Sequence, residues 1–227
     1  MIKKFFLILI LIMISFISWN KFNLSQYIQP YLPQEILKDN TSLNMVSAIV
    51  LDYRIYDTLF EVIVFTVAVT GISKYLMKLP EYGDYKNEKD SVVETMIPII
   101  FQIIVLISLY IAITGHIAPG GGFSAGVILG TGLLGVSFVK PMEDIEKIFV
   151  KSKIEKLKVL VPFIIIIYAI SGYIFKGVYF YNFGFFGEPG TLFSGGSAII
   201  LNLLIAFEVF SGTWTILYKF IKHRGQL

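Results

Sequence analysis

Long apolar runs alternate with short polar segments along this chain of 227 residues. A helix needs about 20 mostly apolar residues to cross a bilayer. The runs predict spanning helices over Phe5–Trp19, Leu59–Met77, Met96–Thr114, Gly122–Val139, Val159–Phe175 and about Ala198–Tyr218. No small-x-small cleavage site follows the first run, so we interpret it as an uncleaved anchor rather than a signal peptide. The pattern predicts an all-α, polytopic membrane protein with about six transmembrane helices.

The polar connections suggest how the spans are grouped. The charged stretch PEYGDYKNEKDSVVE separates a front part from a rear part. We predict a two-helix module over residues 1–79, a polar cytoplasmic linker over residues 80–94, and a four-helix module over residues 95–227. The lysine-rich stretch between the fourth and fifth spans predicts a short amphipathic helix on the membrane surface.

The distribution of basic residues predicts the orientation. With a cytoplasmic N-terminus, the outer side would hold Lys21, Lys38, Arg54 and Lys176, and the rest of the 19 Lys and Arg residues would lie inside. Such an excess of positive charge marks the cytoplasmic side. Six spans also require both termini on one side. We therefore expect a multi-pass protein of the inner cell membrane with both termini cytoplasmic.

Composition narrows the candidate chemistry. Hydrophobic residues make up 56% of the chain and charged residues only 15%, whereas soluble domains are about 25% charged. There is no cysteine and there are two histidines. Disulfides, thiolate-bound iron–sulfur clusters and the usual zinc sites are thus excluded within this chain. We predict no metal site and no cofactor.

The segment LDYRIYDTLFE contains the first group of candidate residues. The apolar stretch from Asn44 to Met77 is too long for one unbroken span, and DYRIYD is the natural break. Arg54, Asp57 and Glu61 would share one helix face. One interpretation is local: Thr58 and Glu61 form a capping box and Arg54 pairs with Asp57. The other is an ion path in which a cation such as sodium lies between the two carboxylates.

Glu208 is a second candidate because it falls near the middle of the last span. An acidic residue there costs roughly 2.5 to 3.5 kcal/mol on insertion scales. No basic residue lies within reach on its own helix, and Arg54 and His116 map to the outer boundary. We expect Glu208 either to be protonated or to face a polar group of another subunit, with a functional or interface role.

The segment TGHIAPGGGFSAGVILG connects the third and fourth spans. It lacks the Lys-Ser/Thr of a phosphate-binding loop, and no strand precedes it. Glycines recur every four residues and predict a face that another helix can approach closely. His116 is expected to be a polar interface residue, with proton relay as the alternative. The candidates for this packing face and its re-entrant turn are Pro119, Gly120, Gly121, Gly122, Phe123, Gly126 and Gly130.

These segments resemble a known family. GHIAPGGGFSAG resembles the signature GHNAPGGGF of the MnhB-like B subunit of Mrp-type multisubunit sodium/proton antiporters. LDYRIYDTLFE is similar to a segment in the C-terminal part of the large A subunit, which also occurs as a small subunit of membrane-bound hydrogenases. The tail around Glu208 looks like the B-type subunit of hydrogenase and sulfane-reductase complexes. Residues matching the two motifs are Asp52, Arg54, Asp57, Thr58, Glu61, Gly115, His116, Pro119 to Phe123 and Gly126.

The resemblance implies a non-catalytic membrane subunit of a hetero-oligomeric sodium/proton antiporter module, which contributes to the ion path and to subunit packing. Its partners would be other membrane subunits, the lipid bilayer, and Na+ and H+ as transported ions, without nucleic acid. The glycine face would let neighbouring subunits close on this chain. The alternative is a purely structural subunit without ion contact. Whether the parent complex is a free-standing antiporter or a redox-driven pump stays open.

Overall fold

Helices form all the regular structure in the part of the chain that the computed structural model describes, which comprises residues 38–81, 91–151, 154, 158–184 and 186–223. No strand occurs within these ranges. The predicted all-α class is therefore confirmed. The predicted first span, Phe5–Trp19, lies outside the described residues.

Five apolar helices correspond to the five remaining predicted spans. They are α4 (Ile55–Leu76), α5 (Ser91–Thr114), α6 (Gly122–Val136), α9 (Leu160–Lys176) and α10 (Ala198–Lys222). Of these, α4, α5 and α10 are long and apolar enough to cross a membrane, whereas α6 and α9 are shorter. The total of six spans and the orientation of the termini stay predictions.

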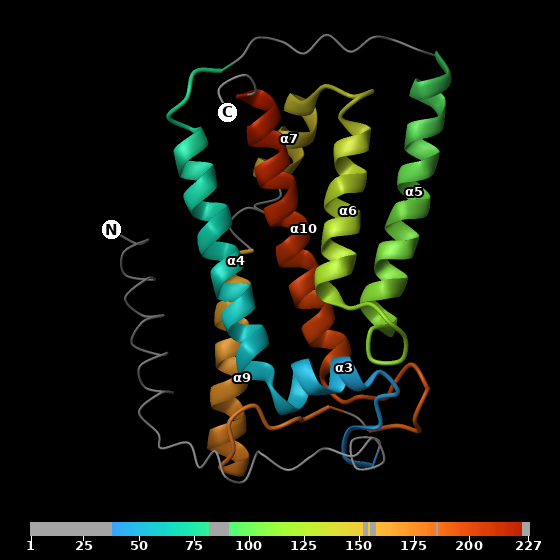
Figure 1. The fold of residues 1–227 in the computed structure, drawn as a ribbon, viewed down its shortest axis with the longest axis vertical. Helices are drawn as coiled ribbons and strands as arrows, with labels where there is room; N and C mark the ends of the chain where they lie inside the picture. The colour runs from blue at the N-terminus through green and yellow to red at the C-terminus, as the bar shows by residue number, and fades with distance from the viewer. Residues whose placement is uncertain (1–37, 82–90, 152–153, 155–157, 185, 224–227) are drawn as a thin grey trace.

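Helix α10 is the centre of the bundle (Figure 1). It packs most extensively against α6 and also against α4, α5 and α9. One reason is an apolar stripe at four-residue spacing, Leu201, Ile205 and Val209, whose side chains are all buried. The stripe belongs to a core that also includes Val62 of α4 and Ile165 of α9.

Short helices lie at both ends of the bundle (Figure 1). At one end, here called the α3 end, α3 (Met45–Ala48) and the π-helix η2 (Ile49–Tyr53) precede α4. Arg54 then leaves the helical region with φ −122° and ψ 33°. This confirms the predicted break in the long apolar segment.

The opposite end, the α7 end, contains α7 (Met142–Lys151). This helix lies where an amphipathic surface helix is predicted. Phe149 of α7 is buried, and its ring lies 5.7 Å from the ring of Trp214 on α10. Aromatic contacts of this kind hold the apolar face of α7 against the bundle.

Candidate functional site

Buried and half-buried polar side chains gather in two places. The first, which we call the polar layer, lies at the α3 end and consists of Asn40, Asn44, Asp52, His116, Asn182, Ser197 and Asn202. The second, which we call the α10 line, lies within the bundle and consists of Thr66, Lys158, Glu208, Ser211 and Thr215. Sequence reasoning selected Asp52, His116 and Glu208 from these two groups.

Asp52 is the acidic member of the polar layer. Asn40 donates a hydrogen bond to its Oδ2, and Asn182 donates to the same oxygen at 3.3 Å. Burial raises the pKa of Asp52 above its usual range, while the two amide hydrogen bonds partly oppose that rise. Asn182 also accepts from the backbone N–H of Ser197 at 2.8 Å. Asp52 therefore joins the segment before α4 to the loop before α10.

Asn44 joins the same front segment to the glycine-rich loop. Its Nδ2 donates to the backbone oxygens of Gly115 at 2.7 Å and Ala118 at 2.9 Å. Its backbone N–H donates to the oxygen of His116 at 3.0 Å, and its Oδ1 caps α3 by accepting from Ser47 N–H. One side chain thus fixes both the start of α3 and the path of residues 115–118.

Asn202 of α10 supports the other side of this loop. Its Oδ1 accepts from the backbone N–H of Gly122 at 2.9 Å. Gly122 is the first residue of α6, where a backbone N–H has no partner within the helix. A buried side chain of α10 therefore replaces the usual N-cap of α6, whose N-cap residue, Gly121, has no side chain.

His116 is completely buried within the polar layer. Neither ring nitrogen has a hydrogen-bond partner of acceptable geometry among the described residues. Burial lowers the pKa of His116 from its ordinary 6.5, and backbone groups of Thr191, Leu192 and Ile113 close to the ring partly oppose this. The imidazole is therefore held neutral near physiological pH.

This burial predicts a pH dependence of stability. The lowered pKa in the folded state means that stability is complete above pH 6.5 and is lost as the pH falls through the folded pKa of His116. His116→Gln cannot take up this proton, so its unfolding temperature should fall less on acidification. Thermal unfolding of the detergent-solubilised complex at several pH values measures this, at about 2–4 °C per kcal/mol. An equal decline in wild type and variant would contradict the prediction.

Of the two local interactions predicted for the motif around Arg54, the structure contains one. Arg54 and Asp57 form the predicted ion pair, and both side chains are more than half exposed. The predicted capping box is wrong. Helix α4 begins three residues before Thr58, whose hydroxyl instead donates to the backbone oxygen of Val50 in η2. Glu61 is exposed on the outer face of α4.

The glycine face of α6 is buried, but its neighbour differs from the expectation. A Cβ on Gly126 would lie 2.6 Å from Cβ of Val209 and 2.7 Å from the backbone oxygen of Ala206, and Gly130 similarly meets Thr213. The helix that closes on these glycines is therefore α10 of the same chain rather than another subunit, because the loop over residues 115–121 returns α6 alongside it.

The tip of the re-entrant turn is more exposed to solvent than the glycine face of α6. Pro119 and Gly120 are exposed, and Gly120 and Gly121 have φ values of 155° and 132° that L-residues rarely adopt. Phe123, at the start of α6, packs edge-on against Phe65 of α4. The turn thus combines an exposed tip with an anchored helix start.

Glu208 has partners that sequence reasoning missed. Its side chain is 1% exposed, and Thr66 of α4 donates a hydrogen bond to Oε1. Gly212, one turn further along α10, allows this approach, because a Cβ there would lie 2.4 Å from the ring of Phe65. Of the two expectations for Glu208, the polar partner on another subunit is corrected, because Thr66 belongs to the same chain, and protonation stays a prediction. Its second oxygen, Oε2, has no hydrogen-bond partner within the described ranges.

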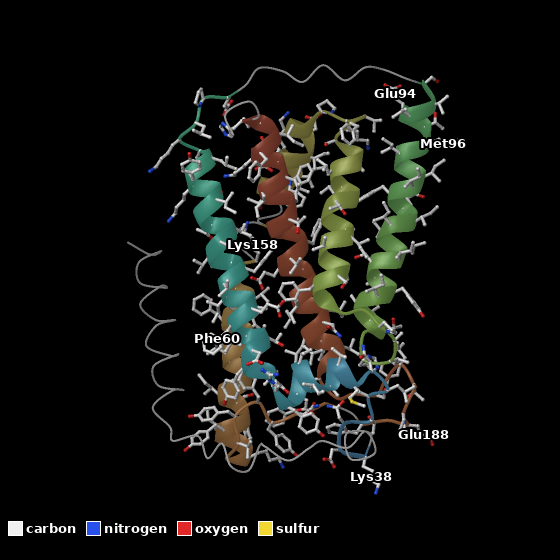
Figure 2. The ribbon with its side chains drawn as sticks, in the orientation of Figure 1. Lys38, Phe60, Glu94, Met96, Lys158 and Glu188 are labelled. Carbon is white, nitrogen blue, oxygen red and sulfur yellow. The ribbon has the colours of Figure 1, made fainter. Side chains whose placement is uncertain are left out.

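Lys158 is the second missed partner. Its position before the fifth span predicts a cytoplasmic loop, yet it is 7% exposed and lies beside α10 near the middle of the bundle (Figure 2). Its Nζ donates to Thr215 Oγ1 at 2.9 Å, and it is close enough to Glu208 to act on the carboxylate electrostatically. The signal for it is weak: one lysine directly before the apolar run VLVPFIIII.

Chains in two solved structures resemble this one in fold. In a solved structure of the membrane-bound sulfane sulfur reductase, an archaeal respiratory membrane complex, one chain is 26% identical to this one with a TM-score of 0.70, over 98% of this chain and 99% of that chain. A chain of the Mrp complex from Dietzia sp. DQ12-45-1b shares the fold, with a TM-score of 0.67 and 20% identity over 91% of this chain and 23% of that chain.

An uncharacterized protein of Methanocaldococcus jannaschii, MJ1307, is 28% identical in an alignment of 196 positions that covers 76% of this chain and 74% of that protein. The strongest assignment comes from a family model, described as a domain related to the MnhB subunit of Na+/H+ antiporter, which matches residues 92–215. This match spans the glycine-rich loop, α6, α9 and most of α10. The resemblance inferred from the sequence is thereby confirmed, and the chain belongs to the MnhB-related family of antiporter subunit domains.

Proposed function

We propose that this chain is a non-catalytic, multi-pass subunit of an inner-membrane complex that exchanges Na+ for H+, and that it contributes to the ion path as well as to subunit packing. The observation that carries the proposal is the burial of the Glu208 carboxyl group on α10. A carboxyl group buried on a spanning helix is costly, and such groups usually mark ion or proton pathways. Here it accepts a hydrogen bond from the half-buried Thr66 on α4, and the buried Lys158 before α9 acts on it electrostatically.

Glu61 supports the need for other membrane subunits. It is exposed on α4, a helix long and apolar enough to span the bilayer. A carboxylate facing lipid hydrocarbon is unfavourable, so a polar surface of another chain is its favoured environment. The largely exposed apolar surface of α5, which includes Ile99, Ile103 and Leu106, is available for lipid or for such chains.

Substitution of Glu61 and Glu208 distinguishes a role in the ion path from a purely structural role. We expect Glu61→Gln and Glu208→Gln to assemble normally, because glutamine keeps the shape and a hydrogen-bond acceptor. We expect each to reduce sodium-dependent antiport by about tenfold or more, since one lost charge interaction of about 1.4 kcal/mol has that effect. Antiport in membrane vesicles and recovery of the intact complex are the two measurements.

Glu188→Gln is the matched control, because Glu188 is exposed in the loop at the α3 end (Figure 2). This change should leave both antiport and assembly unaltered. If the Glu61 and Glu208 variants instead lose antiport only in proportion to lost assembly, the chain is a structural subunit without ion contact.

A further inference from the structure

The α10 line places three polar side chains on one face of α10. Glu208, Ser211 and Thr215 are separated by three and four residues, so they share one face of α10. All three are buried. Thr66 donates to Glu208 at one end of this face, and Lys158 donates to Thr215 at the other. A carboxyl group and the threonine that binds an ammonium group thus lie about two turns apart on one face of α10, with the Ser211 hydroxyl between them.

The hydroxyl groups of Thr215 and Ser211 lie on α10 between the ammonium group of Lys158 and the carboxyl group of Glu208. Thr215 donates its own proton to the backbone oxygen of Ser211 at 2.7 Å, so it accepts from Lys158 Nζ. Ser211 Oγ and Glu208 Oε2, one turn apart, have no hydrogen-bond partners in the part of the chain that the structure describes. A hydroxyl can accept from one neighbour while it donates to another. For a proton to reach Glu208, the Thr215 hydroxyl must turn from the backbone oxygen of Ser211 toward Ser211 Oγ, and one water molecule must bridge Ser211 Oγ and Glu208 Oε2.

The same geometry disfavours a sodium ion. Hard cations bind where several oxygen ligands converge and negative charge is in excess. Here the single carboxylate is accompanied by the ammonium group of Lys158, whose positive charge acts on it. No group of three or more Asp, Glu, His or Cys side chains suited to a metal ion occurs in the described ranges. A second cation beside Lys158 would be repelled at low dielectric.

We propose that Glu208 and Lys158 form a proton-transfer pair within the bundle, connected through Ser211 and Thr215, which excludes Na+. In this step the ammonium group of Lys158 releases one proton and Glu208 takes up one, so that a charged pair becomes a neutral amine and a carboxylic acid. No electron moves. The inference rests on the proposed function and specifies which of the two transported ions this cluster handles.

Infrared difference spectroscopy of the purified intact complex tests the choice of ion. A change of pH at constant sodium should give a carboxylic-acid band that is lost in Glu208→Gln and shifted in Glu208→Asp. Replacing sodium by choline at constant pH should give no band that depends on Glu208. A sodium-dependent Glu208 band, or the absence of a Glu208 band in the pH experiment, would overturn the proposal.

Lys158 variants test the transfer step. Lys158→Met should lower the maximal antiport rate by about 100-fold, the effect expected for loss of a positioned proton carrier, with little change in the half-saturating sodium concentration. Lys158→Arg keeps the charge but cannot release a proton, so it should remain slow. Restoration of the rate by arginine would show that Lys158 only compensates charge, which contradicts the proposal. Lys140→Met, which removes an exposed lysine between α6 and α7, is the control.

These outcomes are distinct from failure of the proposed function. An assembled Glu208→Gln complex with unchanged antiport would remove Glu208 from the ion path. A sodium-sensitive Glu208 band would overturn only the assignment to protons. If a Lys158 variant does not assemble, the infrared comparison decides, because it is made with Lys158 in place.

Discussion

Gly126→Val should prevent α6 from packing against α10 and should abolish recovery of the folded chain. A Cβ at this position would lie 2.6 Å from Val209 Cβ, 2.7 Å from the backbone oxygen of Ala206 and 2.9 Å from the backbone nitrogen of Phe210. Two of these neighbours are backbone atoms, which no change of rotamer can move. Overpacking costs about 1–3 kcal/mol where side chains can adjust, and we expect more here.

The same helix supplies the matched control for this prediction. A Cβ on Gly135 would meet nothing within 4 Å. Gly135→Val introduces the same side chain into α6 without a collision, so it should fold normally. Recovery of detergent-solubilised protein and its unfolding temperature compare the two variants. Equal stability of Gly126→Val and Gly135→Val would show that the α6–α10 contact is not as close as described.

Asn44→Ala should release the glycine-rich loop and destabilise the chain by about 2–4 kcal/mol. The estimate combines two lost hydrogen bonds of about 1 kcal/mol each with a lost helix cap of about 1 kcal/mol. The bonds are those to Gly115 and Ala118, and the cap is that of α3. Thermal unfolding gives the loss of stability, and hydrogen exchange should increase at residues 115–118.

Two further variants separate these contributions. Asn44→Asp keeps an acceptor for the cap of α3 but loses both donors to the loop, so it should retain the cap and still loosen residues 115–118. Val46→Ala changes a side chain of α3 that is 68% exposed and should have little effect. If Asn44→Ala leaves hydrogen exchange in the loop unchanged, Asn44 does not hold it.

The Asn44 contacts also bear on the division of the chain. The sequence places Asn44 in a front module and Gly115 in a rear module, separated by a polar linker. In the structure the polar layer joins the two parts through Asn44 and through Asp52, which accepts from Asn182. Variants of the front segment should therefore change the glycine-rich loop as well.

The sequence by itself determined the features that depend on local chemistry. Uninterrupted apolar runs specify long apolar helices, because a helix satisfies the hydrogen bonds of its own backbone. Glycines at four-residue spacing specify a close helix contact. Charges three residues apart specify the Arg54–Asp57 ion pair. The motif residues also identified the family, since each of these signals lies within a short stretch of chain.

Only the tertiary structure decided which elements meet. The glycine face could have served another subunit, but the return of α6 places it against α10 of the same chain. Thr66 lies 142 positions from Glu208 and Lys158 lies 57 from Thr215, so no local pattern connects them. Pairing of buried polar groups depends on helix packing, which is set by contacts along the whole bundle rather than by neighbouring residues.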